Sequence, residues 1–159
     1  MPIQISGTML LQGVVSGLLA GGLYALVALG LALIFGVMRV INIAHGALLM
    51  LGAYTTYWLF ALVGMNPFAS LLVSVPLLFV VGVVLQKLFV HRVVGAPELS
   101  SLLLTFGLSI AIANLAQYAW TADYRSVEYL TTSVRFAGLA FSAARMVSFA
   151  LALLISLLA

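Results

Sequence analysis

The sequence contains no cysteine and very little charge. Without cysteine the chain can form no disulfide, can use no thiolate as a nucleophile, and can hold no Cys-ligated zinc or iron–sulfur centre. Three acidic and six basic residues make up 6% of the 159 positions, whereas roughly a quarter of the residues of an average soluble domain are charged. Because so few charges could not cover the surface of a soluble fold, most of this surface is suited to lipid.

The residue patterns of several other functions are also missing. The six basic residues stand singly between apolar runs and form no patch that would bind nucleic acid. No G-x-x-x-x-G-K-[ST] loop is present to bind ATP. Residues 107–109 have the G-x-S pattern of an intramembrane serine protease, but His45 and His91 both precede it, so the serine has no later histidine as a base. A single histidine without a nearby carboxylate or cysteine is no metal site. We therefore predict no catalytic, cofactor-binding or metal-binding residue.

Hydrophobic residues are abundant instead: they form 65% of the chain and give a mean hydropathy of +1.32. About 20 helical residues cross a bilayer core of about 30 Å, and backbone groups in lipid are satisfied only within helices or closed barrels. The apolar runs do not alternate with polar residues, which favours helices over barrel strands. We predict an all-α polytopic transmembrane helix bundle. Its four complete spans are Leu10–Val37, Ala47–Val63, Ala69–Val90 and Leu102–Trp120.

The end of the chain is a fifth apolar run, Met146–Ala159. At 1.5 Å per residue it is about 21 Å long, shorter than the bilayer core. We expect that the chain is truncated within a fifth span, because this run has no polar face with which to lie on the membrane surface. The segment Thr121–Arg145 carries five of the nine charged residues and is predicted to lie outside the membrane. The basic residues divide equally between the two sides. Asp123 and Glu128 lie in the longer loop together with three of the basic residues, and we therefore favour an N-terminus outside.

A stripe of small residues marks the first span. Gly13, Gly17 and Gly21 recur every four residues and therefore share one helix face. Such a face lets a second helix approach closely. We predict a tight helix–helix contact at Gly17 and Gly21; the alternative is that the stripe lines a translocation path.

The densest polar cluster near the membrane is R-V-I-N-I-A-H-G, residues 39–46. Arg39, Asn42 and His45 recur every three residues, roughly on one helical face. Polar groups at membrane depth are costly unless they face protein or water. Two interpretations are open: a short interfacial connection in which Asn42 or His45 satisfies a helix end, or part of a substrate path or gate formed by Asn42, His45 and Gly46.

The fourth span also carries polar residues. Thr105 and Ser109 are four residues apart, and Asn114 lies one turn or more beyond them. Such side chains can hydrogen-bond to a neighbouring helix for about 0.6–2 kcal/mol. Structural hydrogen bonding and substrate contact are equally open, so Ser109 and Asn114 join the candidates for the substrate path or gate.

Two motifs in the first third of the chain are more specific. The run G-G-L-Y-A-L-V-A-L-G-L is followed by I-N-I-A-H-G, and R-V-V-G-A-P-E-L-S-S-L-L-L-T-F-G-L-S comes later in the same order. With these motifs the chain resembles the permease subunits of bacterial branched-chain amino-acid ABC transporters. The resemblance covers most of the chain, and it is strongest from Gly17 to Tyr54.

The resemblance implies a multi-pass subunit of the bacterial inner membrane. Such a permease pairs with a second, related permease, two cytoplasmic ATPase subunits drive the pair, and a periplasmic binding protein delivers leucine, isoleucine or valine. ATP would be bound by the partners and not by this chain. The family layout places Lys87 and Arg92 on the cytoplasmic side and the loop Thr121–Arg145 outside. Residues 1–159 would be the N-terminal part of one permease domain, lacking the later segment that engages the ATPase.

Two alternatives are kept. Permeases for urea and short amides resemble the same motifs, so the substrate class is open between them and branched-chain amino acids. A membrane scaffold derived from a permease fragment, without transport activity, is the other alternative. Genes for ATPases and a binding protein beside this one would favour the transporter.

Overall fold

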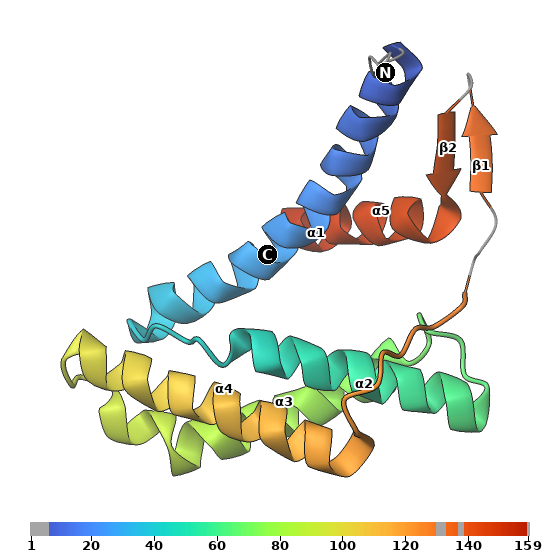
Figure 1. The fold of residues 1–159 in the computed structure, drawn as a ribbon. Helices are drawn as coiled ribbons and strands as arrows, with labels where there is room; N and C mark the ends of the chain where they lie inside the picture. Colours follow the sequence, from blue (N-terminus) through green and yellow to red (C-terminus); the bar gives the residue numbers. More distant parts are fainter. Residues whose placement is uncertain (1–6, 130–132, 137–138, 159) are drawn as a thin grey trace, which may run out of the picture. The chain divides into compact units, whose positions relative to one another are not determined.

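The computed structural model describes residues 7–129, 133–136 and 139–158. These residues fall into two compact units, one drawn from the two ends of the chain (up to residue 32 and from residue 128) and one formed by residues 33–127. Figure 1 shows the elements in chain order: α1 (Gly7–Met38), α2 (His45–Val63), α3 (Leu71–Leu88), the 3-10 helix η1 (Val90–Val93), α4 (Glu98–Trp120), β1 (Ser133–Phe136), β2 (Leu139–Ser142) and α5 (Ala143–Leu158).

The helices α1 to α4 are each long and apolar enough to cross a membrane. The predicted transmembrane helix bundle is therefore confirmed, and the four helices coincide with the four predicted spans to within a few residues. The largest difference is the start of α4, at Glu98 and not at Leu102. Pro97 has an extended ψ of 144° and ends the preceding loop. Glu98 then stands in the first turn, where a carboxylate interacts favourably with the positive end of the helix dipole.

A small antiparallel hairpin, β1–β2, was not predicted. Ser133 pairs with Ser142 and Phe136 pairs with Leu139. The sequence prediction treated the whole segment Thr121–Arg145 as a loop, and strands of four residues leave too little alternation to be recognised. The strand β2 leads directly into α5, whose 16 residues span about 24 Å. That α5 is part of a fifth membrane span stays a prediction.

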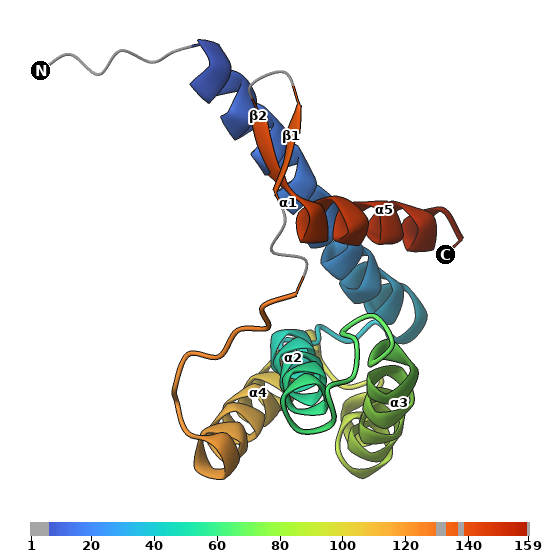
Figure 2. The same ribbon diagram turned by 90° about the vertical axis from the view of Figure 1, so that its right-hand side faces the viewer.

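In the unit formed by the two ends of the chain, α5 crosses α1 at Gly22 (Figure 2). A Cβ atom on Gly22 would overlap the ring of Phe149, so a close approach of these two helices requires glycine at this position. Gly13, Gly17 and Gly21 differ: a Cβ on any of them would meet no other described atom within 4 Å. Among the described residues, nothing packs closely against the small-residue stripe at these three positions. A contact there with another subunit or another part of the protein stays a prediction.

In the unit of residues 33–127, α2 lies against both α3 and α4 (Figure 2). Small side chains form the contacts between these helices. A Cβ on Gly52 of α2 would lie 2.9 Å from a methyl group of Leu78 in α3, and the Ser70 hydroxyl donates a hydrogen bond to Thr56 at 3.1 Å. Small residues let helix backbones approach closely in lipid, where association depends on packing and hydrogen bonds. The buried residues of this unit are Val40, Ala44, Ala47, Ser70, Ser74, Ser101, Thr105, Ile112 and Ala116.

Candidate functional site

The segment between α1 and α2, residues 39–44, is not helical; we call it the connector. The helix α1 ends where Arg39 takes a left-handed conformation with φ of 51°, which is uncommon for a residue other than glycine. Its backbone N–H still donates to the Phe35 carbonyl at 2.8 Å. The expectation that Arg39, Asn42 and His45 share a helical face is therefore wrong, because the chain leaves the helix before Asn42.

Thr105 of α4 holds the connector in place. Its side chain is fully buried, and its hydroxyl donates to the Ile41 carbonyl at 2.8 Å and accepts from the Ile43 N–H at 3.2 Å. A hydroxyl has one proton and two lone pairs, so one side chain satisfies two backbone groups of an irregular segment at once. Non-helical backbone at membrane depth requires such internal partners. The position was noted in the sequence only as the neighbour of Ser109, and it was not selected as a candidate.

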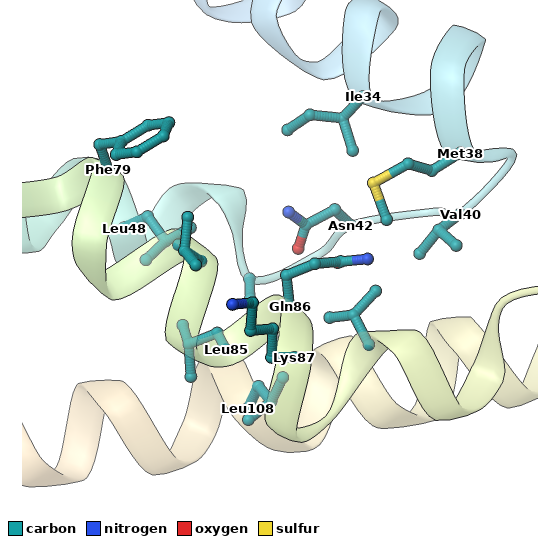
Figure 3. Close-up of a pocket in the computed structure, with 14 residues that line it drawn as sticks. Ile34, Met38, Val40, Asn42, Leu48, Phe79, Leu85, Gln86, Lys87 and Leu108 are labelled. Atoms are coloured by element: carbon teal, nitrogen blue, oxygen red, sulfur yellow. The ribbon is translucent and has the colours of Figure 1, made fainter.

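The connector borders a cavity of about 510 Å³, the connector cavity. Figure 3 shows the Asn42 side chain reaching from the connector toward the α3 segment that carries Gln86 and Lys87. These three side chains supply an amide, a second amide and an ammonium group. The remaining lining is apolar, and it comes from α1, the connector, α2, α3, η1 and α4: Ile34, Met38, Val40, Ala44, Leu48, Phe79, Gly82, Val83, Leu85, Val90 and Leu108.

Of the five candidates for a substrate path or gate, the structure brings Asn42 to this cavity. His45 begins α2, directly after the lining residue Ala44, and its Nε2 atom is buried without a hydrogen-bond partner among the described residues. Gly46, Ser109 and Asn114 are not lining residues of the connector cavity. Whether these residues contact a substrate stays a prediction.

The alternative interpretation of the cluster is a short connection in which the side chain of Asn42 or His45 satisfies a helix end. Among the described residues, no side chain caps the start of α2. The N-cap position of α2 is Ala44, and no side-chain hydrogen bond caps the helix. The Asn42 backbone carbonyl, and not its side chain, accepts the His45 N–H at 3.3 Å. The Asn42 amide is thus left to face the connector cavity.

A second pocket, of about 340 Å³, lies beside α2 and the segment that follows α4. It contains Arg125, whose guanidinium carbon lies 5.4 Å from the centre of the Tyr57 ring and 5.0 Å from that of Trp58. Tyr54 stacks on Trp120 with ring centres 4.9 Å apart. We call this the aromatic pocket; its lining residues are Met50, Ala53, Tyr54, Tyr57, Ala122, Asp123, Tyr124 and Arg125.

Sequence reasoning did not select the aromatic pocket. The sequence predicts Trp120 as an aromatic anchor at the membrane interface, at the end of the fourth span, and Arg125 as a charge in the loop that follows. The sequence does contain a sign of this pocket. Three aromatic residues, Tyr54, Tyr57 and Trp58, lie in one apolar run, and a single arginine, Arg125, follows another apolar run. No group of three or more potential metal ligands occurs among the described residues.

Comparison with known proteins identifies the family. Residues 13–159 match the family described as "Branched-chain amino acid transport system / permease component". The chain belongs to this family. It is 27% identical over 128 residues to the high-affinity branched-chain amino acid transport system permease protein BraD of Pseudomonas aeruginosa, covering 76% of this chain and 42% of BraD. It is 30% identical over 112 residues to the permease protein LivH of the corresponding high-affinity system of Escherichia coli, covering 65% of this chain and 36% of LivH.

The permease protein LivH of Salmonella typhimurium is 28% identical over 112 residues. The matched region spans about two fifths of the length of these curated relatives. No solved structure matches the chain. The relatives are transport permease components, and the four apolar helices agree with a multi-pass membrane protein.

Proposed function

We propose that the chain is a transmembrane permease subunit of an ATP-driven ABC importer for branched-chain amino acids. The family match over residues 13–159 carries this proposal. Four helices long enough to cross the bilayer supply a scaffold for a path. The sequence has no phosphate-binding loop of the Walker type, so the energy of ATP would have to come from other subunits.

The partners in this proposal are a second permease, two cytoplasmic ATPase subunits and a periplasmic binding protein, assembled in the bacterial inner membrane. ATP would be held by the ATPase subunits, and this chain would bind no cofactor. Residues 1–159 would form the N-terminal part of one permease domain. The exposed apolar surface of α1, which has no buried residue among those described, supports a need for lipid or for a partner helix.

The lining of the connector cavity favours branched-chain amino acids over urea or short amides. Leucine, isoleucine and valine have apolar side chains, which an apolar wall accommodates without leaving polar groups unpaired. Urea and short amides present hydrogen-bonding groups on nearly every side, and they would need a more polar lining than Asn42, Gln86 and Lys87 provide. Asn42, Gln86 and Lys87 are the polar side chains of this lining, and they would meet the polar end of a passing amino acid.

Reconstitution tests this proposal. The permease is placed in proteoliposomes with its partner permease, the ATPases and the binding protein, and uptake of labelled leucine is measured with and without ATP. We expect uptake only when ATP is present, and we expect neither uptake nor ATP hydrolysis from the 159-residue chain alone. Uptake that proceeds without ATP and collapses with an ionophore would assign the protein to another transporter class. Absence of transport by the whole assembly would favour the scaffold.

A further inference from the structure

The aromatic pocket combines two opposite charges with an apolar and aromatic wall. Asp123 and Arg125 stand two residues apart in the segment that follows α4, and both line the pocket. Met50, Tyr54 and Tyr57 line it from α2. A pocket that holds a cation and an anion beside apolar surface has the chemistry to recognise a zwitterion with an apolar side chain.

The Arg125 side chain is held firmly in this pocket. Its guanidinium packs against Tyr57 and Trp58, and Nη2 donates to the Trp120 carbonyl at 2.7 Å, at the C-terminal end of α4. A positive charge is favourable at that end of a helix. The Nε atom is buried and has no acceptor among the described residues. A buried donor without an acceptor is rare and costly, so the guanidinium has capacity for a further oxygen ligand.

The turn that carries these charges is strained. Thr121 has φ of 64° and ψ of 169°, a backbone region that β-branched residues rarely adopt. Its N–H donates to the Gln117 carbonyl at 2.9 Å, and its hydroxyl donates to the Asp123 carboxylate at 2.5 Å. Strain of this kind is retained where the surrounding structure fixes it, and it is concentrated at functional sites. Here the strained turn directs Asp123 and Arg125 to the same pocket.

We propose that the aromatic pocket binds the free amino acid before it enters the path. The Arg125 guanidinium binds the α-carboxylate, the Asp123 carboxylate binds the α-ammonium group, and Met50, Tyr54 and Tyr57 contact the aliphatic side chain. This inference rests on the proposed function, because it takes an amino acid as the substrate. The pocket volume of about 340 Å³ accommodates an amino acid of the size of leucine.

The native tryptophans provide the assay. The chain has two of them: Trp58 contacts Arg125, and Trp120 stacks on Tyr54. Leucine is titrated into the 159-residue chain in phosphatidylcholine nanodiscs, and tryptophan emission is recorded. We expect a saturable change. 4-Methylpentanoate lacks the ammonium group and 3-methylbutylamine lacks the carboxylate, so each should bind at least about tenfold more weakly, the effect of losing one charged hydrogen-bonded contact.

Two variants test which side chain binds the ammonium group of leucine and which binds its carboxylate. Asp123→Asn should bind leucine and 4-methylpentanoate equally, because the partner of the ammonium group is lost. Arg125→Gln should bind leucine and 3-methylbutylamine equally, because the partner of the carboxylate is lost. Asp123 has an exposed side chain, so its substitution tests the proposal even if Arg125→Gln fails to fold. Arg92→Gln is the matched control: Arg92 is exposed in η1, before the start of α4, and this variant should titrate like the native chain.

Several results would overturn the proposal. Leucine could cause no saturable change, or both variants could keep the native ligand preferences. A change caused by adding phosphatidylethanolamine to the nanodisc, and not by leucine, would show that a lipid headgroup with a primary ammonium group occupies the pocket instead. Uptake by the complete transporter separates this outcome from the proposed function. If leucine uptake persists while leucine leaves the tryptophan emission unchanged, the pocket assignment is wrong and the transport function stands.

Discussion

The Thr105 hydroxyl donates a hydrogen bond to the Ile41 carbonyl at 2.8 Å, across 64 positions of the sequence. The same oxygen accepts the Ile43 N–H at 3.2 Å. A side chain of the apolar helix α4 thus supplies the partners of two backbone groups in an irregular segment. Thr105 therefore fixes two backbone groups of the connector, one on each side of Asn42.

Thr105→Val should therefore destabilise the protein. Valine has nearly the same shape, but it leaves the Ile41 carbonyl and the Ile43 N–H without their partner, at a cost of about 1–3 kcal/mol. Thermal unfolding in detergent measures the loss. Thr105→Ser keeps the hydroxyl and should recover most of the stability, and Ser109→Ala, one turn away in α4, serves as the control. A Thr105→Val variant as stable as the native chain would show that the connector does not depend on these hydrogen bonds.

Gly22→Ala should weaken the packing of α5 on α1. The added methyl group would overlap the Phe149 ring, and overpacking of this kind costs about 1–3 kcal/mol. Phe149→Ala creates space, so the double variant should lose less stability than the sum of the two single variants. Thermal unfolding of all three variants gives this coupling. Additive losses would mean that the two residues are not in contact.

Gly17→Leu and Gly21→Leu should behave differently from Gly22→Ala. Nothing in the described structure lies within 4 Å of a Cβ at these positions, so the isolated chain should keep its thermal stability. If the stripe accepts a helix of the second permease, the larger side chains should prevent close approach and reduce copurification of the two subunits. If both variants copurify normally with the second permease, the predicted helix–helix contact at Gly17 and Gly21 is wrong.

The sequence was sufficient to predict the helices, because hydropathy and length alone decide which segments can cross a bilayer. It was not sufficient for the contacts between them. The four-residue spacing of Gly13, Gly17 and Gly21 defines a face, but spacing does not say which helix covers that face. The close contact lies one residue away, at Gly22, because the position of Phe149 in α5 decides it.

The candidate site shows the same limit. The polar residues of the connector were recognised as costly in a membrane, and Asn42 does line a cavity. Their assignment to one helical face was wrong, because α1 ends at Arg39, which has a left-handed backbone conformation. The hydrogen-bond partner of the connector is Thr105, which lies 62 or more residues later in the sequence. The surroundings of Arg125 likewise depend on rings from α2. Such long-range contacts leave no periodic pattern in a single sequence.

Cysteine labelling tests the membrane topology, since the native chain has no cysteine. The 23 residues of α4 form about 35 Å of helix, enough to cross a core of about 30 Å, so the segments before and after α4 should lie on opposite sides. Ala96 precedes this helix and Ser126 follows it, and both are exposed. In intact cells, an impermeant thiol reagent should label Ser126→Cys, and it should label Ala96→Cys only after the membrane is opened.

The pattern of labelling tests separately the orientation of the chain and whether α4 crosses the membrane. The reverse pattern would invert the orientation, which rests on the resemblance to branched-chain amino-acid permeases and on the two acidic residues, Asp123 and Glu128, in the segment after α4. It would also place the aromatic pocket on the cytoplasmic side, where an incoming amino acid arrives last. Labelling of both variants from the same side would mean that α4 does not cross the membrane. Ala96→Cys is preferred to a substitution of Gly95, whose φ of +85° strains any residue that carries a Cβ atom.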